Sequence, residues 1–375
     1  AQRMTRQSLT TTARAWLEVD VGALRRNGEA IARRAGVPLL PMVKADGYGL
    51  GALAAVRALE PLAPWGYGVA TVDEGRALRD AGVTRPIVVF TPLLPCEFGA
   101  ARALRLTPGL GDPAAIAAWG EGGPEPWHLG IDTGMSRAGV RWDEIAAVRD
   151  LVERHPPEGA FTHFHSAELN DGSRELQERR FDEALAGLPT RPAVVHAENS
   201  PAVEHHAPSR WSLVRSGIFL YGVASGGALE PEPVVALRAR IVELRRVEAG
   251  EVVSYDATWT APAPRRIATV ACGYADGYRR ALGNRAVALV NGRPASVVGV
   301  VTMDMTMLDV TDAPCAVGDV ATLVGRDGDR LLTVADVARA GELSPYELLT
   351  GLRLRLPRRY HDGGADATST PAPDA

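Results

Sequence analysis

Lysine is almost absent from this chain. The 41 basic residues among 375 include a single lysine, Lys44, and all the others are arginine. Arginine can replace lysine wherever a positive charge is sufficient, but its guanidinium stays protonated and is no nucleophile. A lysine that persists in such a background is therefore expected to perform amine chemistry, as a Schiff-base residue or a general base. Lys44 also closes the apolar run 39–43, which is an unusual place for a surface lysine.

Cysteine, long apolar runs and an excess of one charge are also lacking. The three cysteines, Cys96, Cys272 and Cys315, have no metal or redox spacing, so we expect no metal site and a reducing, cytoplasmic location. No run approaches the roughly 18 apolar residues that a membrane span needs, and no secretory segment is recognisable, so no membrane association is expected. With 45 acidic against 41 basic residues, nothing indicates a nucleic-acid partner.

Short apolar runs alternate with amphipathic or alanine-rich segments over the first two-thirds of the chain. Eight strands alternating with helices over roughly 200 residues are typical of an α/β fold of the (β/α)8 TIM-type barrel class, here expected over 16–235. A mainly β C-terminal domain is expected over 236–360, and an early strand at 16–20 can pair with it. Residues 361–375 lack an apolar anchor and are expected to form a disordered tail.

The expected barrel strands are 39–44, 66–70, 86–90, about 105–109, 127–131, 160–164, 193–197 and 213–217. The expected helices between them include 21–35, 52–60, 73–82, 142–155 and 174–187. In the second domain, one expected β-run extends over 251–260.

Polar residues follow several predicted barrel strands, where such folds place their active sites. They are Lys44, Arg137, His163, Ser200 and Arg215. Phosphate sites in these barrels form in the loops after strands seven and eight, where Ser200 and the amides of Gly217 and Ile218 lie. A phosphate-bearing ligand near a unique lysine indicates pyridoxal phosphate as the cofactor.

Eight motifs resemble those of alanine racemases and occur in the same order. The segment VKADGYGLG (43–51) resembles the cofactor-lysine motif of that family. The others are HLGIDTGMSRAGV (128–140), FTHFHSAE (161–168), HAENS (196–200), VRSGIFLYG (214–222), VSYDATWTAP (253–262), GYADGY (273–278) and VTMDMTMLDV (301–310). The resemblance covers about 16–360. It implies a pyridoxal-phosphate-dependent isomerase that interconverts L- and D-alanine and supplies D-alanine for the cell wall.

The resemblance also implies the residues that perform catalysis. Lys44 would carry the cofactor and act as the base on the face that handles D-alanine. Tyr255 matches the tyrosine that acts on the L-alanine face and that is supplied by the partner subunit of a homodimer. Arg215 would hydrogen-bond the pyridine nitrogen of the cofactor, and His163 would link Arg215 to Tyr255. Racemisation needs an acid and a base on opposite faces, so the site must lower the high pKa of lysine, of tyrosine, or of both.

Further residues are implied to hold the cofactor and the amino-acid substrate. The residues expected to bind the phosphate are Tyr48, Ser200, Gly217 and Ile218. Arg137 would contact the cofactor phenolate and the substrate carboxylate, and the Met303 amide would add a second carboxylate contact. The fixed fork of a guanidinium suits two such oxygens.

The sequence departs from the family pattern at three positions. Gly130 stands where many alanine racemases have a carbamylated lysine that holds the arginine matching Arg137, so another anion, or a bound chloride, must orient Arg137, or the arginine is looser. Leu354 replaces an expected tyrosine, and Val300 replaces an arginine of the entrance channel. A wider, less polar entrance would admit serine or larger amino acids.

Three alternatives therefore stay open at the level of sequence. A racemase of broader specificity fits the three departures. A decarboxylase built on the same barrel-plus-β architecture is disfavoured by the setting of Tyr255. A non-catalytic cofactor carrier would need only the barrel and no second base. The second domain with Tyr255 therefore disfavours this alternative.

Overall fold

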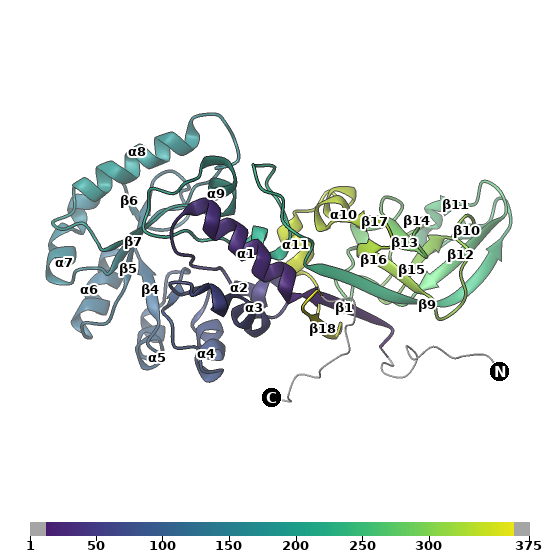
Figure 1. Ribbon diagram of the computed structural model, residues 1–375, viewed down its shortest axis with the longest axis horizontal. Coiled ribbons are helices and arrows are strands. Elements are labelled where there is room, and N and C mark those ends of the chain that lie inside the picture. Colours follow the sequence, from purple (N-terminus) through teal and green to yellow (C-terminus); the bar gives the residue numbers. More distant parts are fainter. Residues whose placement is uncertain (1–12, 364–375) are drawn as a thin grey trace. The chain divides into compact units, whose positions relative to one another are not determined.

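The computed structural model describes residues 13–363 and divides into two compact units (Figure 1). One unit comprises Val21–Val234. The other comprises the described residues up to Asp20 together with those from Val235 onwards.

The first unit is built on parallel strands. Six of them form one path in the order β2 (Tyr67–Val69), β3 (Ile87–Val89), β4 (Thr107–Leu110), β5 (His128–Asp132), β7 (Gly159–Phe161) and β8 (Val194–His196). Parallel bridges Leu39–Val214, Met42–Gly68 and Asn199–Arg215 add the first and eighth expected strands and close the ring. The bonds from Leu40 N to Val214 O (2.8 Å) and from Val43 N to Gly68 O (2.9 Å) belong to this closure. The predicted TIM-type barrel is confirmed.

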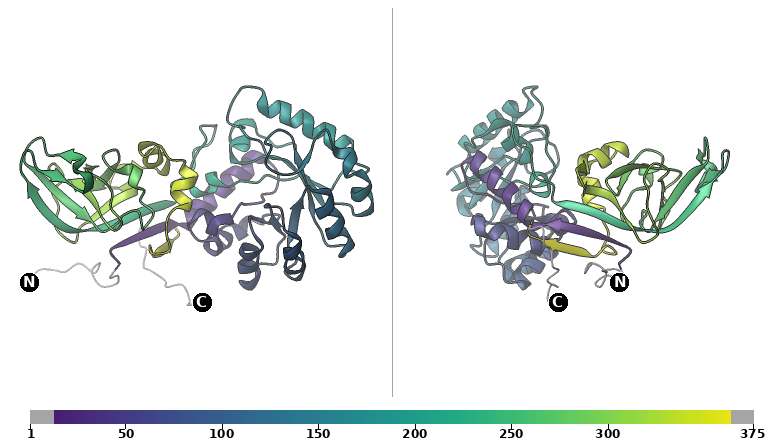
Figure 2. Two further views of the ribbon diagram at one scale, coloured as in Figure 1. Left: turned by 180° about the vertical axis from the view of Figure 1, so that it is seen from behind. Right: turned by 45° about the vertical axis from the view of Figure 1, so that its right-hand side comes forward.

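Helices cover the outside of this barrel (Figure 2). They are α1 (Val21–Ala35), α3 (Ala52–Leu59), α4 (Val72–Asp80), α5 (Phe98–Ala103), α6 (Pro113–Glu121), α7 (Arg149–Arg154), α8 (Ser173–Ala186) and α9 (Ser200–His206). Side-chain oxygens cap several N-termini: Thr71 accepts from the Glu74 amide, Asp112 from that of Ala115, and Asn199 from that of Ala202. Such caps explain where these helices begin, and α4 begins within one residue of the start expected for the helix 73–82.

The helix expected over 142–155 is wrong in its first half. Residues Val140–Arg141 form the short strand β6, which pairs with β5, and Ile145–Ala147 form a 3-10 turn. A bond from Trp142 N to Asp132 O (3.0 Å) ties this segment to the end of β5. Because the backbone donor is used there, the helix α7 begins only at Arg149.

The second unit is mainly β, as predicted. Its nine-stranded sheet has the order β17-β16-β13-β14-β15-β12-β9-β1-β18, and an additional β16–β9 pairing closes part of it on itself. The long strand β9 (Val235–Val247) pairs with three neighbours, and buried residues alternate along its first half. The other strands are β1 (Ala15–Asp20), β12 (Arg265–Val270), β13 (Val287–Val290), β14 (Arg293–Val297), β15 (Thr306–Asp309), β16 (Val320–Asp327), β17 (Arg330–Leu332) and β18 (Arg358–His361). Two short helices, α10 (Val334–Ala340) and α11 (Pro345–Thr350), follow β17.

Two details of this unit bear on the expected division of the chain. Strand β1 pairs antiparallel with β9 and parallel with β18, so the expected pairing of 16–20 with the second domain is confirmed, and β1 belongs to this unit although it opens the range 16–235. The β-run expected over 251–260 is divided into β10 (Val252–Val253) and β11 (Trp259–Thr260) by the turn Tyr255–Ala257. His361 is the last residue of β18, and most of the expected tail, 364–375, lies outside the described residues.

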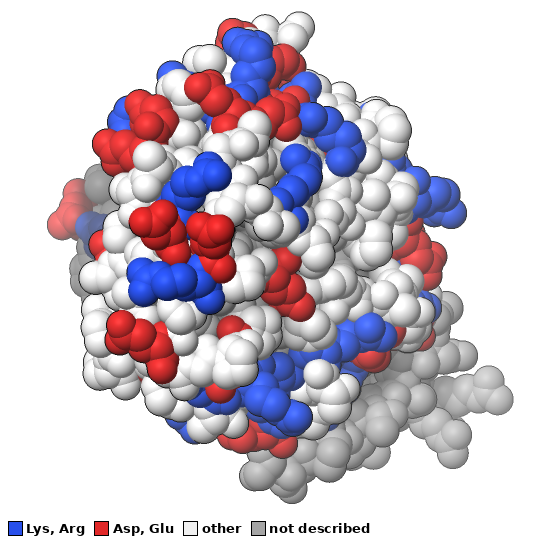
Figure 3. All heavy atoms as spheres, turned by 90° about the vertical axis from the view of Figure 1, so that its left-hand side faces the viewer, with Lys and Arg blue, Asp and Glu red and all other residues white. Residues whose placement is uncertain are grey.

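The barrel face seen in Figure 3 carries acidic and basic side chains interspersed, without an extended field of one sign. Among residues 13–363, no helix is long and apolar enough to span a bilayer.

Candidate active site

Lys44 stands at the start of an unusual left-handed turn. It opens the short element α2 (Lys44–Tyr48), in which Ala45, Asp46, Gly47 and Tyr48 have φ values of 53°, 51°, 59° and 54°. Residues other than glycine avoid this region, at a cost of roughly 1–2 kcal/mol each. Such a turn persists only where its surroundings hold it in place, and strain of this kind clusters at functional sites.

Two carboxylates hold the Lys44 turn. Glu74 of α4 accepts from the Ala45 amide (2.7 Å) and, with its other oxygen, from the Ala70 amide (2.7 Å) at the end of β2. Asp46 accepts from the Ala52 amide (2.9 Å), which ties the turn to the start of α3. The backbone next to Lys44 is therefore fixed to the barrel on two sides.

The environment of Lys44 favours the neutral amine. Burial lowers the pKa of Lys44, and the positive charges of Arg137 and Arg215 lower it further, while Glu74 opposes them. This is the direction that a lysine needs in order to donate and accept a proton near neutrality.

Arg215 is fully enclosed at the carboxyl end of the eighth strand. Its guanidinium donates to His196 Nδ1 (2.7 Å), to the carbonyls of Thr162 (2.6 Å) and Ala197 (2.9 Å), and to His163 Nδ1 (3.3 Å). Burial lowers the pKa of Arg215 to about 9, so the group remains a cation at neutral pH. Burial and the charge of Arg215 also lower the pKa of His163 to about 3, so this imidazole is neutral. Because its Nδ1 accepts from Arg215, the proton of His163 lies on Nε2.

The four predicted phosphate ligands come together. The Ser200 hydroxyl accepts from the Gly217 amide (2.9 Å), and the ring of Tyr48 packs against the same glycine. A Cβ at Gly217 would lie 3.0 Å from Tyr48 Cζ and closer still to its hydroxyl oxygen, so the approach requires glycine. Within the described part of the chain, the Ile218 amide donates to no backbone or side-chain acceptor. Hydroxyls and a spare amide at the start of a 3-10 turn suit a phosphate group, so these residues fit pyridoxal phosphate.

Arg137 and Gly130 lie where the sequence leaves the family pattern. Among residues 13–363, Arg137 has no protein carboxylate or hydrogen-bond partner, and its side chain is exposed. The ring of Phe161 lies 3.2 Å from the position of a Cβ at Gly130 and 2.9 Å from that of a Cβ at Gly109. An aromatic ring thus occupies the room that a longer side chain at 130 would need. No protein anion has replaced the carbamylated lysine in the described structure.

The remaining predicted site residues belong to the second unit. Tyr255 lies on the turn between β10 and β11 and is 65% exposed. The neighbouring Ser254 donates to the Val300 carbonyl (2.7 Å), and a Cβ at Gly299 would lie 2.7 Å from Ser254 Cβ, so glycine allows this close packing. The side chain of Val300 is buried, whereas Leu354 is 85% exposed.

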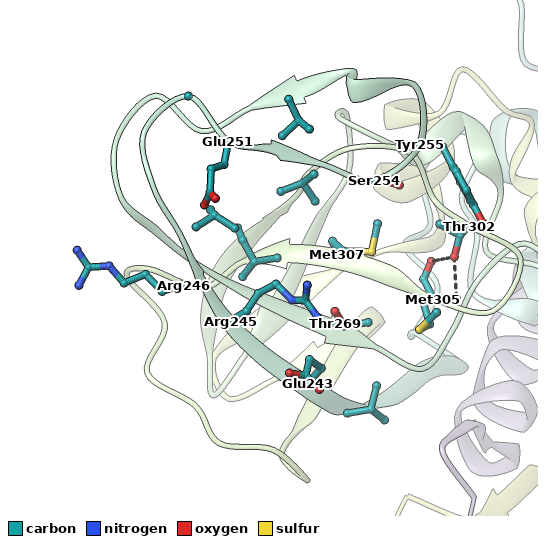
Figure 4. Close-up of a pocket in the computed structure, with 16 residues that line it drawn as sticks. Glu243, Arg245, Arg246, Glu251, Ser254, Tyr255, Thr269, Thr302, Met305 and Met307 are labelled. Atoms are coloured by element: carbon teal, nitrogen blue, oxygen red, sulfur yellow. Dashed lines mark hydrogen bonds between the residues drawn. The ribbon is translucent and has the colours of Figure 1, made fainter.

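Tyr255 lies at one end of a groove of about 1090 Å³ (Figure 4). Thr302 and Met305 lie at the same end, and Arg246 and Glu251 lie toward the other. The 302–305 loop is closed by two bonds between Thr302 Oγ1 and the backbone of Met305 (2.9 and 3.2 Å). Met303 on this loop is exposed. Within residues 13–363 its amide has no acceptor, as a carboxylate ligand would require.

Several structurally important residues were missed from the sequence. Glu74 supports the Lys44 turn, and His196 contacts Arg215; the signal for His196 was its place in the HAENS motif. Arg355 binds both carboxylate oxygens of the buried Asp276 (2.6 and 2.9 Å) and one oxygen of Asp304 (2.7 Å). Arg355 thereby ties together the two loops that carry Asp276 and Asp304.

Comparison with known proteins adds independent findings. Residues 19–225 match the N-terminal domain of alanine racemase, and residues 234–360 match its C-terminal domain. The alanine racemase of Symbiobacterium thermophilum is 38% identical over 371 residues, covering 94% of this chain and 98% of the relative. The structure is similar to that of alanine racemase from Bacillus anthracis with bound L-Ala-P (TM-score 0.87, 29% identity, 95% and 97% of the chains). It is also similar to that of the Bartonella henselae enzyme with covalently bound pyridoxal phosphate (TM-score 0.86, 27% identity, 93% and 100%).

Proposed function

The chain belongs to the alanine racemase family, and from that premise we propose that it interconverts L- and D-alanine with Lys44 and Tyr255 as the two bases. The observation that carries the proposal is the environment of Lys44. The only lysine of the chain sits on a strained, carboxylate-held turn whose surroundings lower its pKa.

The cofactor-binding residues are proposed as predicted. Ser200, Gly217, Ile218 and Tyr48 would hold the phosphate of pyridoxal phosphate, Lys44 would hold it covalently, and Arg215 would face its pyridine nitrogen. When bound, the cofactor draws electron density away from Cα of the substrate and so acidifies the Cα–H bond. Arg215 stays charged and donates only, which disfavours a proton on the pyridine nitrogen and limits competing reactions of the substrate.

Proton transfer is assigned to two atoms. Lys44 Nζ would take or give the Cα proton on one face, and Tyr255 Oη would do so on the other. His163 presents Nε2–H while its Nδ1 is held by Arg215, so it would donate to the tyrosine oxygen and stabilise its deprotonated form. Arg137 and the Met303 amide would orient the substrate carboxylate, and both lack a competing partner among the described residues.

We propose a homodimer in which Tyr255 acts in trans. The support is a concentration of exposed apolar side chains: Val252, Tyr255 and Met305 line the groove, and Met303 lies on the 302–305 loop at its end. An apolar surface of this kind on a β-rich unit is expected to be covered by another surface. A reducing, cytoplasmic location is also proposed, in keeping with three cysteines that form no disulfide.

Mixed dimers test the trans arrangement. Lys44→Ala and Tyr255→Phe homodimers are each expected to be inactive, but each hybrid dimer would contain one site with an intact Lys44 and Tyr255. Random exchange of subunits should restore about a quarter of the wild-type sites. If the mixture stays inactive although mass spectrometry detects hybrid dimers, both residues act within one subunit and the trans proposal fails.

The activity test compares substrates. The purified protein is incubated separately with L-alanine and L-serine, and the D-enantiomers are separated by chiral chromatography. Fast formation of D-alanine with little D-serine would support alanine racemase. Comparable turnover of serine would favour the broader racemase, for which the exposed Leu354 and the lack of a carboxylate partner for Arg137 among the described residues are the structural reasons. Absence of turnover in protein that binds the cofactor would contradict both.

A further inference from the structure

A continuous line of polar side chains crosses the interior of the barrel below Arg215. Arg215 Nη1 lies 2.7 Å from His196 Nδ1, and His196 Nε2 lies 2.9 Å from His128 Nδ1. His128 Nε2 lies 3.4 Å from a carboxylate oxygen of Glu158. Both histidines are fully buried, whereas the Glu158 side chain is 39% exposed.

The strand directions give this line its orientation. His128 is the first residue of β5, and Glu158 directly precedes β7, so both stand at the amino-terminal edge of the parallel barrel. Arg215 stands at the opposite, carboxyl edge, where the candidate site lies. The line therefore joins the solvent at one end of the barrel to the Arg215 guanidinium at the other.

The chemistry of the partners fixes where every proton lies. A guanidinium only donates, so His196 Nδ1 must accept and the His196 proton must be on Nε2. His196 then donates to His128 Nδ1, which places the His128 proton on Nε2, facing the Glu158 carboxylate. Burial lowers the pKa of both imidazoles, and the charge of Arg215 acts in the same direction. Glu158 raises the pKa of His128, but burial outweighs it, so both imidazoles remain neutral.

Among the described residues, no other polar side chain forms a hydrogen bond with the two imidazoles, and aromatic rings pack beside them. The ring of Trp65 lies 5.7 Å from that of His128, and Phe161 stacks on His196 at 5.4 Å with Phe90 edge-on at 6.2 Å. The charged groups that act on Arg215 itself are Glu198, which stabilises its cation, and Arg137, which opposes it. Among the described residues, however, all hydrogen-bond acceptors of Arg215 are neutral.

We propose that Glu158, His128 and His196 form a positioning relay that fixes the orientation of Arg215 from the far end of the barrel. The carboxylate and the guanidinium favour the same tautomers from opposite ends of the line. Glu158 favours the His128 proton on Nε2, so that His128 Nδ1 accepts from His196, and His196 thereby presents a lone pair to the guanidinium. With the opposite tautomer, two N–H groups would face each other at 2.7 Å and Arg215 would move. The relay itself rests on contacts within the barrel, and only its consequence for catalysis rests on the proposed function.

Histidine NMR tests the relay without requiring turnover. In protein with 15N-labelled histidine, His128, His196 and His163 should appear as neutral histidines with the proton on Nε2, and none of the three should titrate between about pH 5 and 9. In Glu158→Ala only Arg215 still favours these tautomers, so the second tautomer should become populated for His128 and His196. The matched control is Glu153→Ala. It removes an exposed carboxylate on α7 and should leave the His128 and His196 signals unchanged. An Nδ1 proton on His196 in the unaltered protein, or an unchanged spectrum in Glu158→Ala, would overturn the proposal.

Kinetics then measure the consequence for the site. Glu158→Ala should lower kcat by about fivefold, the worth of one polar contact, with little change in KM, and Glu153→Ala should not. His128→Gln keeps one acceptor and one donor in the same order and should retain activity, whereas His128→Leu should lose it. If His128→Gln and His128→Leu are equally impaired while both fold, the histidine only fills space and the relay is refuted. If the protein racemises no amino acid at all, the NMR result still decides the relay and only the proposed function fails.

Discussion

Gly217 offers the sharpest test of the proposed phosphate site. In Gly217→Ala the new methyl group would lie 3.0 Å from Tyr48 Cζ and 3.5 Å from Met42 Cβ, and it would overlap the Tyr48 hydroxyl. The Tyr48 ring cannot move away freely, because it is stacked on the ring of Tyr221 with 4.6 Å between the ring centres. The Tyr221 hydroxyl in turn donates a hydrogen bond to the Met42 carbonyl (3.0 Å). Forced overpacking of this kind costs about 1–3 kcal/mol.

We expect this cost of overpacking to appear mainly as weaker binding of pyridoxal phosphate. The methyl group displaces the Tyr48 hydroxyl from the place where, with Ser200 and the Ile218 amide, it would bind the phosphate. A loss of about 1–3 kcal/mol corresponds to a Kd for pyridoxal phosphate raised by about fivefold to more than a hundredfold. Fluorescence or absorbance titration of the apoenzyme with pyridoxal phosphate measures it, and inorganic phosphate as competitor reports on the phosphate site alone.

Two further variants control this experiment. Gly99→Ala, in helix α5, adds a methyl group with nothing within 4 Å and should leave the Kd unchanged. Tyr48→Phe removes the overlapping hydroxyl, so Gly217→Ala should cost less in that background than alone. Unaltered affinity in a folded Gly217→Ala protein would refute the assignment of the phosphate site.

Three other predictions follow from the site. Lys44→Arg keeps the positive charge but removes the amine, so activity should fall by at least about a thousandfold. The Lys44 side chain makes no hydrogen bond to the described residues, so the unfolding temperature should not change. A retained rate would contradict the assignment of Lys44 as a base. Tyr255→Phe should abolish racemisation, while in D2O the α-hydrogen of D-alanine, but not of L-alanine, still exchanges, as NMR can show. The pKa of His163 is lowered from 6.5 to about 3, so the unfolded chain takes up its proton first, and stability should fall as pH drops from 6.5 toward 3. In denaturant titrations, His163→Gln should reduce that slope by up to about 1.4 kcal/mol per pH unit, whereas an unchanged slope would mean that His163 is charged in the fold.

The sequence predicted the barrel because its signal is local and repeated. Alternating apolar and amphipathic runs place a strand at each of the eight positions, and α1 has the predicted bounds, 21–35. Family membership was likewise predicted from ordered motifs and is confirmed by matches over 19–225 and 234–360. Lys44 was singled out by composition alone, because chemistry that needs an amine resists replacement by arginine.

Local patterns failed where a distant partner decides the conformation. Strand β1 precedes the barrel in sequence and was included in its range, but it pairs with the second unit, as was expected to be possible for 16–20, because its apolar face, including Leu17, packs in the sheet beside β9. The run expected over 251–260 breaks at Tyr255, where Ser254 is tied to Val300, 46 positions away. The β-propensity of a segment cannot predict a turn that depends on a hydrogen bond to the distant Val300 carbonyl and on close packing against the distant Gly299.

Composition and motif order alone determined the fold class and the family of this protein, and they singled out Lys44 as the lysine expected to carry the cofactor. Only the tertiary structure decided which groups act on those residues. Glu74 reaches the Lys44 turn from the next helix, and His128 and His196 reach Arg215 through the barrel. The physical reason is that a pKa or a side-chain orientation is set by burial and by charges within a few ångströms, and folding brings these from positions that no sequence spacing connects.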